Sequence, residues 1–308
     1  MIEPKSCSYE EFPAAPETCP GMKVIQTKRD ECKLAYHANV EYDRYEGGPL
    51  SLQILFPYYA DERPASFPCL VFVQGSGWGV QNVYSNVASL AKLAEKGYVI
   101  AVVQYRHSAA APFPAQVIDT RTAVKFLRKN AAAYNIDETR IAVSGDSSGG
   151  HTSLMLTVTE GLGAFASEKY PGYSDHISAC VDFYGPTAIY EMNEAPSGMD
   201  HYGADSPEGM LIGGLDVQEN LELAKKTDPV LYLEKERPLP PVLIFHGDKD
   251  PIVPFRQSVR LYDALLENGK EAYFYKMLGA EHGGPGFWTD EVIGLVDEFL
   301  RRSFAADC

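Results

Sequence analysis

The sequence predicts an α/β fold in which a mostly parallel β-sheet carries helices on both faces. Two observations lead to this fold class. Segments with strand-like and helix-like spacing alternate along most of the chain, and several of the strand-like segments are continuous apolar runs. Such runs are typical of parallel strands that are buried on both faces between two helical layers. The length of 308 residues allows one or two domains of ordinary size.

The first expected elements follow one another as strand, helix, strand and helix. The apolar run CLVFVQ at 69–74 precedes glycines, and YVIAVV at 98–103 is a second buried strand. Between them, residues 83–96 have helical spacing and end at a glycine, which commonly follows a helix. A long helix is expected over 115–134, because its apolar side chains share one face and Pro114 stands at its start.

The second half of the chain continues this alternation. A strand over 141–144 is followed by a helix over about 148–160. The remaining expected elements are strands at 50–56, 177–183, 241–246 and 272–277 and helices at 257–268 and 290–304.

Two stretches depart from the rhythm. Residues 1–22 are rich in Pro, Glu and Ser, and we interpret them as a flexible arm. Residues 186–237 hold several Gly and Pro, many acidic residues and no clear strand. An insertion at the carboxyl end of a strand overhangs the ligand crevice of an open α/β sheet. We therefore expect one domain over 23–308, with 186–237 as a small cap.

The composition restricts the class of protein. Hydrophobic residues make up 45% and charged residues 22%, which excludes a disordered, collagen-like or coiled-coil chain. The formal net charge of -15 disfavours binding to nucleic acids and to anionic membrane surfaces. We expect neither partner, and the sequence does not indicate an oligomeric state.

The amino-terminal residues lack the basic start and the apolar stretch of a secretory signal, and no window reaches the ~18 apolar residues of a membrane span. Six scattered cysteines contain no C-x-x-C pair. They indicate reduced thiols in a cytoplasmic protein, and the alternative is a mature chain whose signal has been removed. These cysteines are Cys7, Cys19, Cys32, Cys69, Cys180 and Cys308.

The segment GDSSGG at 145–150 fits the pattern G-x-S-x-G with Ser147 at its centre. It lies between an expected strand and an expected helix, which is where a sharp turn can expose a serine nucleophile. Flanking glycines remove Cβ atoms that would collide in such a turn. A phosphate-binding loop is the alternative, but neither of its glycine patterns occurs here.

A serine hydroxyl needs a base to take its proton, and the base needs a group that orients it. His282 lies in EHGG at 281–284, just after an expected strand, and we predict that it is the base. His246 also ends a strand, and we interpret it as a structural turn residue. Asp248, Asp250 and Asp182 are all candidates for the carboxylate.

With Asp250 the chain order is Ser, Asp, His, which is that of α/β-hydrolases. The chain resembles this superfamily, and within it the small serine esterases grouped with hormone-sensitive-lipase-like and feruloyl or acetyl-xylan esterases. The resemblance spans about 40–304 and rests on QGSGW at 74–78, GDSSGG at 145–150, HGDKDPIVP at 246–254 and EHGG at 281–284. It implies an eight-stranded sheet, and it selects Asp250 as the triad acid because that aspartate precedes a V-P pair.

The family's oxyanion loop, H-G-G-G-[WF], reads QGSGW here. The resemblance implies that the backbone N–H groups of Gly75, Ser76 and Ser148 hold the oxyanion, and Gly77 is the alternative to one of them. Trp78 is expected to anchor this loop by packing, with a role as a substrate platform as the alternative. The candidates for the substrate pocket are Trp78, Tyr184, Phe287 and Trp288.

The resemblance therefore implies a serine carboxylesterase that acts through an acyl-enzyme, without metal or cofactor. It further implies short-chain acyl substrates, such as acetyl or feruloyl groups on plant-derived oligosaccharides, and the acidic composition favours small neutral esters. Three alternatives remain: a prolyl-oligopeptidase-like peptidase, an acyltransferase and a non-catalytic ligand-binding homologue of the hydrolases.

Overall fold

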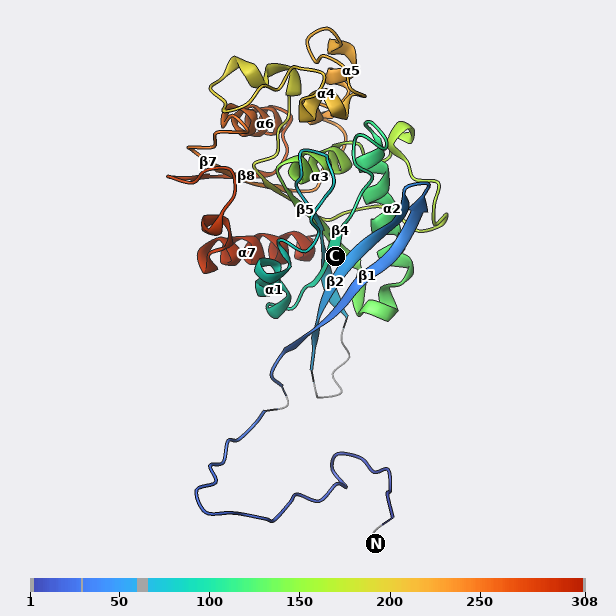
Figure 1. Cartoon of the computed structure of the whole chain (residues 1–308), viewed down its shortest axis with the longest axis vertical. Coiled ribbons are helices and arrows are strands. Elements are labelled where there is room, and N and C mark those ends of the chain that lie inside the picture. Colours follow the sequence, from blue (N-terminus) through green and yellow to red (C-terminus); the bar gives the residue numbers. More distant parts are fainter. Residues whose placement is uncertain (1–2, 29, 60–65, 307–308) are drawn as a thin grey trace.

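A computed structural model describes residues 3–28, 30–59 and 66–306. Within these residues, eight strands form one sheet in the order β1-β2-β4-β3-β5-β6-β7-β8 (Figure 1). β1 is antiparallel to β2, and β2 is antiparallel to β4, whereas all later neighbours are parallel. This confirms the predicted fold class. The strands are β1 (Lys33–Tyr45), β2 (Gly48–Tyr58), β3 (Phe67–Val73), β4 (Val99–Val103), β5 (Ile136–Asp146), β6 (Cys180–Phe183), β7 (Val242–Gly247) and β8 (Ala272–Met277).

Helices cover both faces of the sheet, and the pleat of the central strands explains why. In β3 the side chains of Val71 and Val73 join one hydrophobic cluster, whereas Leu70 and Phe72 join another. Successive side chains of a strand point to opposite faces, so a continuous apolar run serves two layers. One layer holds α1 (Val87–Glu95) and α7 (Asp290–Ala306), and the other holds α2 (Ala115–Lys129), α3 (Ser148–Val158) and α6 (Arg256–Glu267).

Several expected boundaries were wrong, and the strand expected over 141–144 extends over Ile136–Asp146. The helix expected over 83–96 begins only at Val87, and the helix expected over 115–134 ends at Lys129. Asn130 ends that helix, because its side-chain amide donates to the Phe126 carbonyl, and a 3-10 turn follows. β6 contains four residues instead of the expected seven.

β1 was not anticipated as a separate segment. Most of its side chains are exposed or half-buried, and its register with β2 is interrupted by irregularities at two places. A strand at the edge of a sheet needs neither an apolar run nor strict alternation, so its sequence carries little signal.

Residues 186–237 form the upper part of the molecule in Figure 1, and none of these described residues belongs to a strand. Their helical segments are short, and they pack with Trp78 in a small cluster of their own that includes Ile189, Leu211 and Val217. We call this segment the cap, and its role stays a prediction. The segments are η3 (Ile189–Glu194), α4 (Pro207–Leu211), α5 (Leu221–Lys225) and η4 (Pro229–Tyr232).

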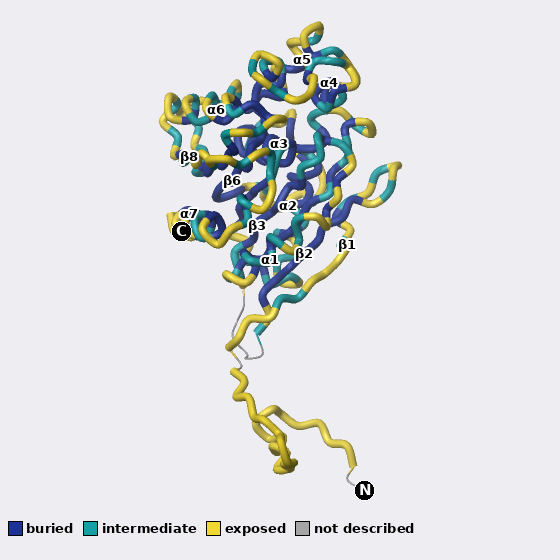
Figure 2. Tube along the Cα trace, turned by 60° about the vertical axis from the view of Figure 1, so that its left-hand side comes forward, coloured by how far each residue is buried: buried dark blue, intermediate teal, exposed yellow. Residues whose placement is uncertain are grey.

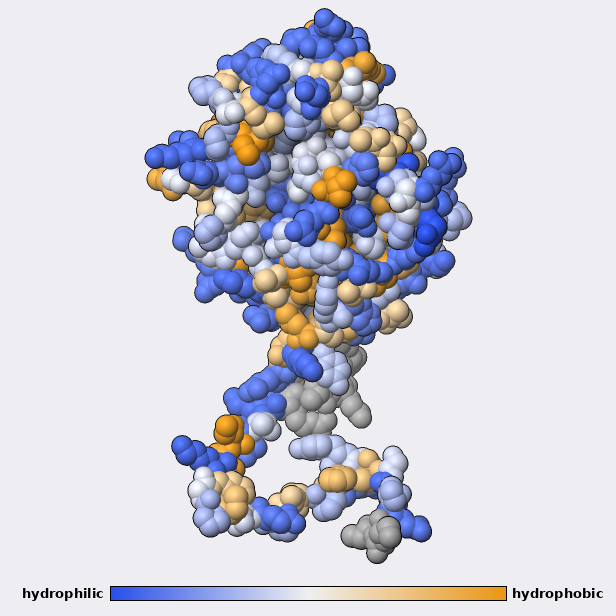
Figure 3. Space-filling view, viewed as in Figure 1, coloured by the Kyte–Doolittle hydropathy of each residue, from blue (hydrophilic) through white to orange (hydrophobic). Residues whose placement is uncertain are grey.

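Residues 3–28 lie outside the sheet and are exposed throughout (Figure 2). The space-filling view in Figure 3 shows the same segment extending from a body whose visible surface is largely hydrophilic. The prediction of a flexible arm over 1–22 is not tested by this geometry, and its first two residues lie outside the described part.

Among the described helices, none combines the length and the apolar character that crossing a bilayer requires. Cys7, Cys19, Cys32, Cys69 and Cys180 are unpaired, while Cys308 lies outside the described residues. Burial raises the pKa of both Cys69 and Cys180 to about 12, so these two thiols stay protonated at neutral pH.

Candidate active site

The turn between β5 and α3 holds Ser147 in a backbone conformation that side-chain-bearing residues rarely adopt, with φ of 54°. Two glycines make the turn sterically feasible. A Cβ at Gly145 would lie 2.3 Å from the carbonyl carbon of Gly149, and a Cβ at Gly149 would lie 1.9 Å from the Val73 carbonyl oxygen. The G-x-S-x-G pattern is thus explained by close backbone approach, and the strain is concentrated at the serine.

The structure brings Ser147, His282 and Asp250 together. Nε2 of His282 lies 2.9 Å from the Ser147 hydroxyl oxygen, and Nδ1 of His282 lies 2.7 Å from Oδ2 of Asp250. The three residues follow the carboxyl ends of β5, β7 and β8, which meet at one edge of the sheet. This geometry allows His282 to take the serine proton while the carboxylate orients its ring.

The carboxylate of Asp250 is held from both sides. Its Oδ1 accepts hydrogen bonds from the backbone amides of Ile252 and Val253, at 2.8 and 2.9 Å. Its Oδ2 lies 3.2 Å from Nε2 of His246 and 2.7 Å from Nδ1 of His282. Burial alone would raise the pKa of Asp250, but the hydrogen bonds from both histidines and the charge of His282 hold it well below its usual value. The group therefore stays ionised.

The other two candidate carboxylates serve elsewhere. Oδ1 of Asp248 accepts from the backbone amide of Gly279, as expected of a turn residue. Asp182 is fully buried and accepts from the backbone amide of Gly185, and burial raises its pKa to about 7. Among the described contacts, neither carboxylate reaches His282, which leaves Asp250.

The oxyanion loop requires a correction to the expected donors. The Gly75 amide donates to Oδ1 of Asp146 at 2.7 Å, and the Ser76 amide donates to the Ser148 hydroxyl at 2.9 Å. Both N–H groups are therefore already engaged. Within the described residues, no acceptor is found for the amides of Gly77 and Ser148, and both residues line the cleft. The structure thus favours the alternative donor Gly77, acting with Ser148.

Sequence reasoning missed the side chains that fix this loop. The Tyr105 hydroxyl donates to the Gln74 carbonyl at 3.2 Å, and it lies 3.2 Å from the Ser76 hydroxyl and 3.4 Å from that of Ser148. Burial raises the pKa of Tyr105 to about 12, so it remains a donor. Tyr105 comes just after the carboxyl end of β4, and that position was the only signal in the sequence.

Three of the four aromatic candidates line the cleft. The Tyr184 ring centroid lies 4.7 Å from that of His282, and Trp288 also lines the cleft. Trp78 is among the lining residues but is almost fully buried, and its indole N–H donates to Nδ1 of His151. The expectation of a packing anchor describes it better than that of a platform. Phe287 is wholly buried against Tyr184 and does not line the cleft, so its assignment to the pocket was wrong.

The cleft has a volume of about 520 Å³. Its lining includes the carboxylates of Asp146 and Glu208, and none of the described residues that line it is a lysine or arginine. Elsewhere in the described part of the chain, no three His, Cys, Asp or Glu side chains gather in a way that could hold a metal ion. The prediction that the chemistry needs no metal stays untested by this geometry.

Comparison with known proteins gives one family match, to the BD-FAE model over residues 53–265. Among curated proteins, the chain is 27% identical over 219 residues to "Esterase LipQ" of Mycobacterium tuberculosis, covering 70% of this chain and 49% of that protein. It is 25% identical over 240 residues to isoprenylcysteine alpha-carbonyl methylesterase ICME of Arabidopsis thaliana, covering 76% of this chain and 54% of that protein. The chain thus spans about half the length of these curated relatives.

Solved structures resemble the fold over most of its length. A truncated form of carbohydrate esterase from gut microbiota superposes with a TM-score of 0.78 at 29% identity, covering 90% of this chain and 99% of its own. The butyrate-bound esterase Est2 of Thermogutta terrifontis gives a TM-score of 0.67 at 25% identity, covering 88% of this chain and 94% of its own.

Proposed function

Because the chain belongs to the BD-FAE family of α/β-hydrolase serine esterases, we propose that it hydrolyses carboxylic esters through a covalent acyl-enzyme. The observation that carries the proposal is the chain of two hydrogen bonds from Ser147 through His282 to Asp250. The names of the curated relatives and of the structural neighbours, which are esterases, support the same reaction class.

In the first half of the reaction, Nε2 of His282 removes the proton of Ser147 as the serine oxygen attacks the ester carbonyl. The negative charge of Asp250 stabilises the imidazolium that forms. The C–O bond to the alcohol then breaks, and His282 returns the proton to the leaving oxygen. In the second half, His282 activates a water molecule, which attacks the acyl-enzyme and releases the carboxylic acid.

The carbonyl oxygen becomes negative in each half of the reaction. The free amides of Gly77 and Ser148 are the donors that we assign to it, and the amide of Ser148 stands at the amino terminus of α3, where the helix dipole favours negative charge. Donors already fixed in position need no reorganisation in the transition state, which is the origin of their catalytic effect. Tyr105 and Asp146 fix them by bonding to the rest of the loop.

For the substrate, we propose small neutral esters with short acyl groups, including acetyl or feruloyl groups on plant-derived oligosaccharides. The cleft is acidic and of moderate volume, which disfavours anionic substrates. The neighbour described as a carbohydrate esterase and the butyrate bound to the neighbour from Thermogutta terrifontis support short acyl groups on hydroxylated alcohols. A cytoplasmic location and the absence of nucleic-acid or membrane partners remain part of the proposal, supported by the unpaired cysteines and the net charge of -15.

The variant Ser147→Ala tests the reaction. We expect kcat on p-nitrophenyl acetate to fall by between about 10⁴-fold and 10⁶-fold, because the nucleophile is lost while the fold is retained. A fluorophosphonate probe should label the wild type and not the variant. Retention of near wild-type turnover would contradict the mechanism, and failure to label the wild type would favour a non-catalytic ligand-binding protein.

The acyl preference is tested with p-nitrophenyl esters from acetate to laurate and with acetylated xylo-oligosaccharides. We expect kcat/KM to be highest for the shortest acyl groups. A preference for laurate would contradict the short-chain proposal, and faster cleavage of aminoacyl-proline amides than of esters would favour a peptidase. Acyl transfer to an added sugar alcohol in preference to water would identify an acyltransferase.

A further inference from the structure

A buried carboxylate in the cap belongs to a residue that lines the cleft, and one of its two oxygens has no hydrogen-bond donor among the described residues. Glu208, in α4, lines the cleft that contains Ser147, yet its side chain is only 5% exposed. Its Oε1 accepts a hydrogen bond from Nδ1 of His201 at 2.9 Å. Its Oε2 has no hydrogen-bond donor among the described residues. Burying a carboxylate oxygen without a donor is costly, so this oxygen calls for a partner that the described residues do not supply.

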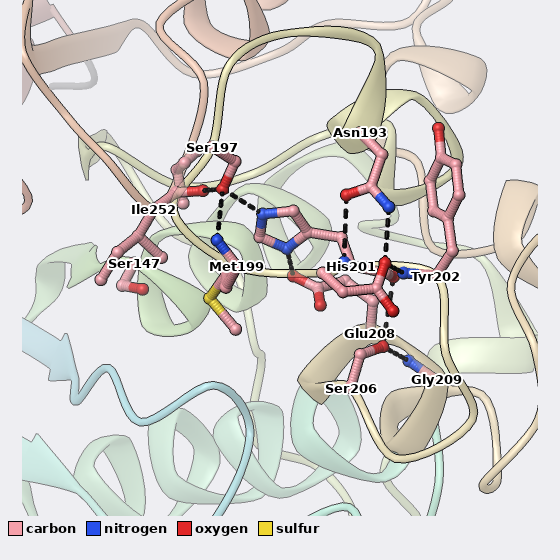
Figure 4. Close-up of polar contacts among 12 residues, drawn as sticks. Ser147, Asn193, Ser197, Met199, His201, Tyr202, Ser206, Glu208, Gly209 and Ile252 are labelled. Atoms are coloured by element: carbon pink, nitrogen blue, oxygen red, sulfur yellow. Dashed lines mark hydrogen bonds and ion pairs between the residues drawn. The ribbon is translucent and has the colours of Figure 1, made fainter.

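The position of this carboxylate is fixed by the surrounding cap (Figure 4). His201 is fully buried, and its Nε2 lies 2.8 Å from the Ser197 hydroxyl. Its backbone amide donates to Oδ1 of Asn193, and its carbonyl accepts from the Ser206 hydroxyl. Three neighbouring groups therefore hold the histidine, and the histidine holds Oε1 of Glu208. His201 occupies only Oε1, so Oε2 remains available to a further donor.

The segment that carries Glu208 also packs against the oxyanion loop. Pro207, the neighbour of Glu208 in the chain, packs on the oxyanion loop so closely that a Cβ at Gly77 would lie 3.2 Å from the Pro207 Cβ. In Figure 4 the Met199 side chain lies between Ser147 and the His201–Glu208 pair. Met199 is partly exposed and lines the same cleft, and its thioether chain adapts easily to a ligand. Displacement of Met199 by substrate would bring a substrate group to Oε2.

We propose that Oε2 of Glu208 accepts a hydrogen bond from a hydroxyl group of the substrate, and that the enzyme therefore prefers hydroxylated esters. A carboxylate oxygen is acceptor-only, so it selects a donor. The same cleft is also lined by Ser85 and Asn86, which are neutral and polar and suit a neutral hydroxyl. A site built to bond a hydroxyl rejects analogues that lack it, because its buried polar group is then left unpaired. This inference rests on the proposed esterase function.

The test measures selectivity between esters of similar size. Glycerol monoacetate is compared with propyl acetate, which places the hydroxyls on the alcohol, and ethyl glycolate with ethyl propanoate, which places one on the acyl group. We expect the wild type to prefer the hydroxylated ester in one pair by at least about tenfold in kcat/KM. The variant Glu208→Gln, whose neutral amide is a weaker acceptor, should reduce that preference by about tenfold.

The ratio within one enzyme preparation does not depend on how much of the variant is folded. The matched control is Glu222→Gln, which makes the same charge change at a largely exposed cap residue, and it should leave the ratio unchanged. The pair that responds identifies the part of the substrate that carries the hydroxyl. A wild type without preference in either pair would overturn the inference, as would an unchanged ratio in Glu208→Gln. Inactivity of the wild type on all four esters and on p-nitrophenyl acetate would instead contradict the esterase function.

Discussion

The two walls of the cleft differ in how completely their polar groups are hydrogen-bonded. On the wall formed by strand ends, Ser147, His282 and Asp250 bond to one another, and the amides around Asp250 complete its carboxylate. On the wall formed by the cap, Glu208 bonds through one oxygen and leaves the other unused. The difference separates two tasks. Bond breaking needs groups that are already in place, whereas selection needs a group that only the right substrate completes.

Apart from the loss of the nucleophile itself, the largest effect should come from Asp250→Asn, which removes the charge of the triad acid. The amide cannot stabilise the imidazolium and favours the wrong tautomer of His282, so we expect kcat on p-nitrophenyl acetate to fall by about 10⁴-fold at neutral pH. Asp248→Asn is the matched control in the same turn, since that side chain bonds to Gly279 instead. Its kcat should stay within about threefold of wild type. Similar losses in the two variants would show that the turn, and not the triad contact, controls turnover.

A second effect concerns His151, whose hydrogen bonds connect the strand-end side of the cleft to the cap. Buried His151 in α3 accepts from the Trp78 indole N–H and bonds through Nε2 to the Thr227 carbonyl of the cap at 2.7 Å. Burial lowers the pKa of His151 to about 4, against about 6.5 in the unfolded chain. The unfolded state therefore binds the proton at higher pH, and the stabilisation present above pH ~6.5 is lost as the pH falls towards 4.

The pH effect is measured as the free energy of unfolding in urea at pH 7 and pH 4.5. We expect His151 to account for about 2–3 kcal/mol of the loss over this interval. The variant His151→Gln, which cannot take up a proton, should lose correspondingly less. Equal losses in variant and wild type would mean that His151 does not titrate between pH 7 and pH 4.5.

The smallest effect sharpens the assignment of the oxyanion loop. Tyr105→Phe removes the hydroxyl that bonds to Gln74 and lies between Ser76 and Ser148. We expect kcat to fall by about tenfold while KM changes less than about twofold, because loosened donors act on the transition state. Tyr98→Phe is the control, since it deletes a buried hydroxyl that bonds to Asp297. A similar kcat in both variants would contradict a positioning role for Tyr105.

Sequence reasoning worked where a feature depends on neighbours along the chain. The strand at 272–277 has the expected bounds, and the turn at Ser147 follows from glycines two residues to either side. The triad acid required more, since Asp248 and Asp182 have the same chemistry as Asp250. The resemblance to a family, and not the spacing of charges, separated the three.

Sequence reasoning failed where a contact joins distant parts of the chain. The sequence marks the amide of Gly75 as an oxyanion donor, but in the structure this amide donates to Asp146, which lies 71 residues later in the chain. Phe287 is an aromatic residue near His282 in the sequence, but it packs against Tyr184, which lies 103 residues earlier in the chain. No pattern in the sequence pairs His201 with Glu208, because seven residues in an irregular cap fix no relative direction for two side chains.

The cap touches the catalytic turn through a narrow contact, and this has a consequence for redesign. The Ser197 hydroxyl approaches the carbonyls of Pro251 and Ile252, and the Gly198 amide donates to Pro251, beside the triad acid. A chimaera that exchanges the entire cap therefore also replaces these contacts of Ser197 and Gly198 with the turn, which we call the clasp. Grafts confined to residues 203–226 would leave the clasp in place and exchange Glu208 with its surroundings. Such grafts would have to keep Pro207, which packs on the oxyanion loop at Gly77, and Leu211, which packs with Trp78.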